Sequence, residues 1–113
     1  MNTLDKSIEV IELYDIYQEL LTKKQQEYME SYYYNNYSIS EIAENFNISR
    51  NAVHDQLKRT VKKMYDYEEK LELRLNIKKR KTIIKKIREE ENLSEIHNLV
   101  EELEKVEWYY GFW

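Results

Sequence analysis

The feature that most limits the fold of this chain is its near lack of turn-forming residues. Its 113 residues include no proline and a single glycine, Gly111. Sheets normally need Gly or Pro at their hairpin turns, and long loops need them to break regular structure. The sequence therefore predicts an all-α protein. A chain of this length forms one domain, or a small domain with an extension.

The sequence also excludes several classes of function. It has no Cys, which rules out disulfides, thiolate catalysis and zinc fingers. The start, MNTLDKSIEV, lacks the features of a secretory signal, and no apolar stretch is long enough to span a membrane. We therefore expect a cytoplasmic protein. It has no Gly-rich phosphate loop and no convincing nucleophile–base set, so we expect neither enzymatic activity nor a cofactor.

Two helices are predicted before residue 35. Apolar residues three and four apart indicate an amphipathic helix over residues 4–21. Its stripe comprises Leu4, Ile8, Ile11, Tyr14, Tyr17 and Leu21, widened by Val10, Leu13 and Leu20. Thr22 and Gln25 have the spacing of a capping box, so a second helix should begin at Lys23 and end near Asn35. Its expected buried face comprises Tyr28, Met29, Tyr32 and Tyr33.

The stretch SISEIAENFNISRNAVHDQLKR, residues 38–59, predicts a helix-turn-helix. Ser38 and Glu41 form a second capping box, and a short apolar stripe runs from Ile39 to Phe46. Asn47 follows, and Asn accepts the left-handed conformation that ends a helix better than any residue except Gly. Ser49 is then a good N-cap for a second helix. Each local signal supports the same structure.

Nothing stops this second helix at an ordinary length. Its stripe comprises Val53, Leu57, Val61, Met64, Leu71 and Leu75. A helix over residues 50–75 would span roughly 39 Å at 1.5 Å per residue, so its distal half needs a partner. We expect a helix-turn-helix domain over residues 1–75, a C-terminal helical extension over residues 76–113, and a homodimer.

The extension should end in a helix capped by Asn92 or Ser94, whose stripe comprises Ile96, Leu99, Val100, Leu103 and Val106. The aromatic end, WYYGFW, has no place in that stripe. Such a tail can insert at a membrane interface or in the groove of a partner, but we expect it to fold back on the core or cover a dimer seam.

The formal charge of −4 hides a segregation along the chain. Residues 1–49 carry 3 basic and 9 acidic side chains, residues 50–88 carry 14 and 5, and residues 89–113 carry 1 and 8. A phosphate group responds to charges within about 10 Å at 0.1 M salt, not to the sum over the chain. The acidic total therefore does not exclude a nucleic-acid ligand for the central segment.

Residues 21–60 resemble the YlxM family of small bacterial proteins. The likeness rests on the LT start at Leu21, the tyrosines at 32–34, SISEIAENF, the ISRNAV–KRT ending, and YEEKLEL at 67–73. The family's helix-turn-helix is similar to region four of sigma factors. The resemblance implies a winged-helix-like DNA-binding core with a long recognition helix, and no enzymatic activity. The family is encoded beside genes of the signal recognition particle, which suggests a regulatory or accessory role in that pathway.

Candidate binding residues lie on the second helix of the motif, whose first turns would face base edges in a major groove. Arg50 suits guanine and Asn51 suits adenine through paired hydrogen bonds, and His54 and Lys58 share their face with Asp55. The phosphate-contacting candidates are Ser49, Lys58, Arg59, Lys62 and Lys63. Five cations, Arg50 with the four basic residues of that set, predict a log–log salt slope of about −4.5. The alternative interpretation is a solvated helix face.

Two further features have competing interpretations. The basic residues of 78–88 either extend the phosphate footprint or pair with the acidic residues of the final segment, which we favour. Those acidic residues are Glu89, Glu90, Glu91, Glu101, Glu102 and Glu104. His97 and Glu101 have a spacing that metal ligands use, but a pair without a third ligand is more often a solvent-facing pair. We therefore expect no metal site.

Two functions remain open from the sequence. The first is a DNA-binding regulator, dimeric, that reads bases through Arg50, Asn51, His54 and Lys58. The second is an accessory protein that binds the GTPase or the RNA of the signal recognition particle through the same basic surface.

Overall fold

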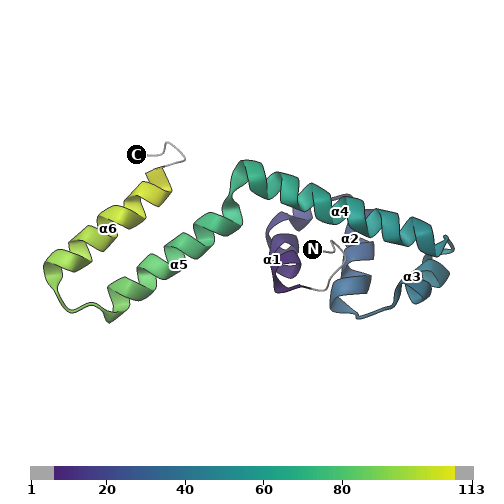
Figure 1. The fold of residues 1–113 in the computed structure, drawn as a ribbon, viewed down its shortest axis with the longest axis horizontal. Helices are drawn as coiled ribbons and strands as arrows, with labels where there is room; N and C mark the ends of the chain where they lie inside the picture. The colour runs from purple at the N-terminus through teal and green to yellow at the C-terminus, as the bar shows by residue number, and fades with distance from the viewer. Residues whose placement is uncertain (1–6, 109–113) are drawn as a thin grey trace. The chain divides into compact units, whose positions relative to one another are not determined.

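The computed structural model describes residues 7–108 of the chain. Its elements are α1 (Ile8–Tyr17), the 3₁₀ helix η1 (Gln18–Leu20), α2 (Lys23–Met29), the π-helix η2 (Glu30–Tyr34), α3 (Ile39–Phe46), α4 (Arg50–Leu71), α5 (Leu73–Glu89) and α6 (Leu93–Trp108) (Figure 1). No residue between 7 and 108 lies in a β-strand. The all-α prediction is confirmed.

The chain divides into two compact units, one ending at Leu71 and the other beginning at Glu72. In the first unit α1, α2 and α3 all contact one face of α4 (Figure 1). The side chains buried where these helices meet include Leu13, Tyr17, Met29, Ile42, Val53, Leu57, Val61 and Met64. A helix that buries a continuous stripe in this way leaves its opposite face to solvent, and that opposite face of α4 carries most of the candidate binding residues.

Both capping boxes are present. The backbone N–H of Gln25 donates to Thr22 Oγ1 at 3.1 Å, and the N–H of Thr22 donates back to the Gln25 side chain at 2.9 Å. The same reciprocal pair joins Ser38 and Glu41, with both distances at 3.1 Å. These bonds satisfy backbone donors that a helix start would otherwise leave unpaired. Helices α2 and α3 therefore begin where the sequence predicts.

The first helix differs from its prediction in the orientation of its stripe. Ile8 was expected at the core but is 78% exposed, whereas Val10 and Leu13, expected at the margins, are fully buried. Helix α1 ends at Tyr17 and η1 follows, so the expected single helix to residue 21 is wrong. Because a tighter turn replaces the last helical turn, Leu21 still reaches the core. Leu4 lies outside the described residues.

Buried tyrosines join α1 to the rest of the first unit. The hydroxyl of Tyr17 donates to Glu68 of α4 at 2.6 Å, and that of Tyr14 donates to Glu30 of η2 at 2.6 Å. Burial raises the pKa of Tyr14 far above its ordinary value, and the bond to the Glu30 carboxylate adds to this effect. The Tyr14 hydroxyl therefore remains a donor at any physiological pH.

The long helix of the motif ends earlier than predicted. Glu72 has a left-handed backbone with φ 51°, which separates α4 from α5, so a continuous helix over residues 50–75 is wrong. Leu71 and Leu75, predicted to continue the buried stripe, are each 42% exposed. Met64 is the last buried residue of α4, although Tyr17 still reaches Glu68 one turn further along the helix.

The second unit is a helical hairpin, in which α5 and α6 lie side by side and run in opposite directions (Figure 1). Asn92 caps α6, since its side chain accepts the N–H of Glu95 at 3.0 Å, which decides between the two predicted caps. The apolar stripe of α6 is half-buried, except for the more exposed Val100. Residues 109–113, most of the aromatic end, lie outside the described residues.

Candidate nucleic-acid interface

The turn between α3 and α4 is held by the backbone at Asn47. Asn47 has φ 55° and ψ 48°, the left-handed conformation that its sequence position predicts. Its N–H donates to the carbonyl of Glu44 at 3.3 Å, and the N–H of Ile48 donates to the carbonyl of Ala43 at 3.0 Å. This pair of bonds is a Schellman motif, which satisfies the last carbonyls of a helix and reverses the chain. The predicted turn is confirmed.

The left-handed conformation of Asn47 leads to a prediction about stability. Asn47 is exposed, so replacing it tests mainly the backbone conformation. Asn47→Ala should cost about 1 kcal/mol in free energy of unfolding relative to Asn47→Gly, because Cβ crowds the following carbonyl when φ is positive. Urea titrations of the two variants and the parent chain measure this difference. Equal stabilities for the Ala and Gly variants would contradict the assignment.

Helix α4 begins directly after this turn. Ser49 Oγ accepts the N–H of Ala52 at 3.0 Å, and the Ser49 carbonyl accepts the N–H of Val53 at 3.1 Å, so Ser49 is the N-cap and Arg50 the first helical residue. Ala43 and Ile42 of α3 are buried, as is Val53 of α4, and the two helices are in contact. The first turn of α4 is therefore held rigidly by buried contacts on one side.

The candidate residues lie mainly on the solvent side. The exposed ones are Ser49, Arg50, Asn51, His54, Lys58, Arg59 and Lys62, and Lys63 is half-buried. Asp55 is exposed among them and lowers the positive potential of this face. Arg50, Asn51 and His54 occupy the first two turns of α4, and the lysines continue along the helix away from the turn.

Two of the predicted phosphate contacts have partners within the helix. Lys62 Nζ lies 3.0 Å from a carboxylate oxygen of Asp66, an ion pair that is exposed on both sides. Lys63 Nζ lies 5.8 Å from the centre of the Tyr67 ring. Oppositely charged residues four apart on a helix commonly pair in this way, so the spacing of Lys62 and Asp66 was a signal in the sequence for this ion pair. The number of cations free to meet phosphate is smaller than the five expected.

A shallow groove joins the starts of α3 and α4, and its lining includes Ser40, which was not among the predicted binding residues. The groove has a volume of about 410 Å³. It is lined by Ser38, Ile39, Ser40, Arg50, Asn51 and His54. Ser40 is exposed on the first turn of α3, where a hydroxyl and helix N–H groups suit an anion. A Ser–x–Ser at a helix start is the only sequence signal that would have drawn attention to it.

Glu41 adds a negative charge near this groove. Its pKa lies below the ordinary value because the backbone N–H of Ser38 donates to its carboxylate and the Ser38 side chain supports the ionised form. Glu41 therefore stays ionised at neutral pH, with its carboxylate directed back to the cap. An anion in the groove would therefore contact the hydroxyls of Ser38 and Ser40 and the Arg50 side chain before the Glu41 carboxylate.

The basic run of the second unit lies on α5, which packs against the acidic helix α6. Helices α5 and α6 pack together, but no lysine from 78 to 86 lies within ion-pairing distance of a described carboxylate. The two helices meet, as the favoured interpretation of this run requires, but the described lysines of the run form no direct ion pair with a described glutamate, so their pairing stays a prediction. Their contact involves apolar side chains, and Ile83 is buried there.

Other kinds of site find no support among the described residues. In residues 7–108 no three His, Asp or Glu side chains gather as metal ligands would, and His97 is exposed. No helix in this range is both long and apolar enough to cross a bilayer.

Comparison with known proteins agrees with the geometry of the motif. Residues 4–106 match the model of the family UPF0122, described as "Putative helix-turn-helix protein, YlxM / p13 like". The UPF0122 protein of Halalkalibacterium halodurans is 42% identical over 108 residues, covering 92% of this chain and 99% of the relative. That of Bacillus pumilus is 43% identical over 109 residues, covering 93% and 99%. That of Fusobacterium nucleatum is 44% identical over 96 residues, covering 82% and 93%. Since the family model and these relatives span most of the chain, the protein belongs to the YlxM/p13-like family of helix-turn-helix proteins.

Proposed function

We propose that this protein is a non-enzymatic, cytoplasmic DNA-binding regulator that places the first turns of α4 in the major groove of duplex DNA. The observation that supports this most is the two-sided character of α4. Val53, Leu57 and Val61 are fully buried on one face, while the polar residues of the first turns are exposed on the other. The Asn47 turn and the Ser49 cap fix the start of the helix. A helix held in this way can enter a groove without local unfolding.

Base reading falls to Arg50, Asn51 and His54. An Arg side chain donates two hydrogen bonds to guanine, and an Asn side chain pairs with adenine, each worth about 1–3 kcal/mol of discrimination. Phosphate positioning falls to Ser40 and Ser49 near the helix starts and to the cations further along α4. Those cations are Lys58, Arg59 and Lys63, with Lys62 available only if it leaves Asp66.

Substitutions of two arginines of α4 distinguish contact with bases from contact with phosphates. Arg50→Ala should weaken binding to a selected site by about 1–3 kcal/mol and leave binding to random duplex DNA much less changed. Arg59→Ala is the matched control, because it makes the same change on the same helix and should weaken both ligands alike. Fluorescence anisotropy titrations with a site obtained by selection from random duplexes measure both effects. Equal losses on both ligands for Arg50→Ala would remove the base-reading role.

A second candidate function has its own supporting observation. The exposed lysines of α5 have no described carboxylate partner, and they lie outside the helix-turn-helix. Structured RNA is recognised largely through backbone and shape, for which such lysines suffice. The protein would then be an accessory of the signal recognition particle that binds its RNA or its GTPase. A pull-down with and without nuclease decides between the two, since a protein partner that survives nuclease supports the accessory role.

A further inference from the structure

The second unit buries too little to stand alone. Among residues 72–106 Ile83, at 8% exposed, is the one buried apolar side chain. An amphipathic helix must cover its apolar stripe with another element, and two helices seldom provide enough cover for each other. Something else therefore has to pack against the hairpin of α5 and α6.

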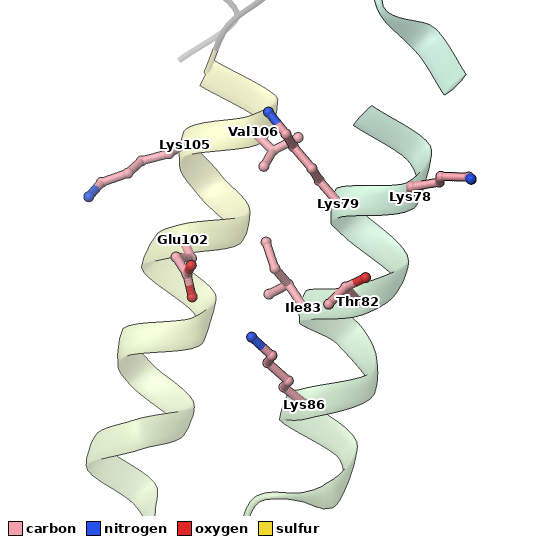
Figure 2. Close-up of a pocket in the computed structure, with 8 residues that line it drawn as sticks. All are labelled: Lys78, Lys79, Thr82, Ile83, Lys86, Glu102, Lys105 and Val106. Carbon is pink, nitrogen blue, oxygen red and sulfur yellow. The ribbon is translucent and has the colours of Figure 1, made fainter. Parts of the chain in front are cut away.

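The two faces of the hairpin differ in chemistry. One face holds a groove of about 490 Å³, in which Ile83 and Val106 lie between the helices, with Lys79 and Lys86 beside them and Glu102 opposite (Figure 2). Ile77 and Ile84 each precede one of these lysines by two residues, and Val100 precedes Glu102 by two. A step of two residues turns nearly to the opposite side of a helix. The other face of the hairpin therefore carries these apolar side chains, with the half-buried Arg80 between Ile77 and Ile84.

This apolar face has no cover among the described residues. It comprises Ile77 and Ile84 of α5 with Leu93, Ile96 and Val100 of α6. Leu93 is 65% exposed, Ile84 43% and Val100 38%, and the other two are half-buried. Contiguous exposed apolar side chains with charged residues at their edges are typical of a protein–protein interface.

The edges of the apolar face carry opposite charges. On the α5 edge Lys81 and Arg88 follow Ile77 and Ile84 by four residues, and on the α6 edge Glu101 and Glu104 lie beside Val100. Residues four apart share one side of a helix. All four charged side chains are exposed, and none forms an ion pair with a described residue. One edge is therefore basic and the other acidic.

We propose that the apolar face binds the same face of a second copy of this chain, forming a four-helix bundle. Two symmetric arrangements are available to such a dimer. A two-fold axis across the helices would place α5 against α5 and α6 against α6, bringing like charges together. An axis along the helices places each α5 antiparallel to the α6 of the partner, so that basic edges meet acidic edges. The charges therefore favour the arrangement in which the two-fold axis runs along the helices. A nucleic acid would not cover apolar side chains, and this interface does not depend on DNA binding by α4.

Exchanging the charges of one edge tests this arrangement. Sedimentation equilibrium of the full chain without nucleic acid should give twice the 14.0 kDa chain mass. Lys81→Glu with Arg88→Glu makes both edges acidic, and Glu101→Lys with Glu104→Lys makes both basic. Each double variant should raise the dimer dissociation constant at least about tenfold. Mixed in equal amounts, the two variants should form a heterodimer, because every α5–α6 contact then joins opposite charges again.

The groove face supplies a matched control. Lys79→Glu with Lys86→Glu makes the same change of charge at the same spacing on α5, but on the opposite face, and should leave dimerisation unchanged. Circular dichroism checks that each variant remains helical. Where a charge reversal lowers the helical signal, Lys81→Gln with Arg88→Gln removes the two positive charges without reversing them. This variant should also raise the dimer dissociation constant. A monomeric parent chain, an unaffected edge variant, a groove variant with an equal effect, or edge variants that fail to associate would each overturn the proposal.

Discussion

Leu57→Ala should lower the free energy of unfolding of the first unit by about 2–5 kcal/mol. Leu57 is fully buried on the face of α4 that packs against the other helices of this unit. Removing three carbons there costs the transfer free energy of those groups and leaves a cavity that rigid helices cannot fully close. Small domains have a total free energy of unfolding of about 5–15 kcal/mol, so this variant should lose a large part of its stability.

Leu71→Ala is the matched control, because it makes the same chemical change on the same helix at a residue 42% exposed. Its cost should stay below about 1 kcal/mol, since exposed positions away from packing tolerate substitution. Urea unfolding followed by circular dichroism measures both variants, and the two transitions should share the same slope if only stability has changed. A similar loss for the two variants would mean that Leu57 does not lie in a packed core.

Local signals predicted the helix-turn-helix well. The capping boxes at Thr22 and Ser38, the left-handed Asn47 and the Ser49 cap each depend on interactions within four residues, so the sequence contains all the information they need. The exposure of Arg50 and its neighbours followed from the same source, because the buried stripe of α4 fixes which face remains in water.

Features that depend on distant parts of the chain were harder to predict. Apolar residues nearly surround α1, so periodicity alone could not choose Val10 over Ile8 as the core position. Leu71 continues the α4 spacing, but its exposure depends on how far the other helices reach. Glu72 is the clearest case, because nothing in its side chain favours the left-handed backbone that separates the two units. Ser40 joins the candidate site only because two helix starts meet in space.

The affinity for random duplex DNA should fall about 40-fold between about 50 and 200 mM salt, corresponding to a log–log slope near −2.7. Each cation that neutralises a phosphate releases about 0.9 of a condensed counterion. Three cations of α4 should contribute, Lys58, Arg59 and Lys63, because Arg50 is assigned to base edges. Lys62 adds nothing to the slope, because leaving Asp66 for a phosphate exposes a carboxylate that takes up a cation in return.

Asp66→Asn tests this account directly. The substitution frees the Lys62 ammonium from its partner at 3.0 Å, so the slope should steepen by about 0.9, and affinity at low salt should rise. The control is Asp66→Asn combined with Lys62→Gln, which removes both members of the pair and should return the slope to the parent value. Anisotropy titrations at several salt concentrations give each slope. A slope near zero would argue against phosphate binding by α4, whereas a steep slope unchanged by Asp66→Asn would place the contacts elsewhere, with the lysines of α5 as the next candidates. The ion pair is exposed, and such pairs are worth at most about 1 kcal/mol, so the substitution should change DNA binding without changing the stability of the fold appreciably.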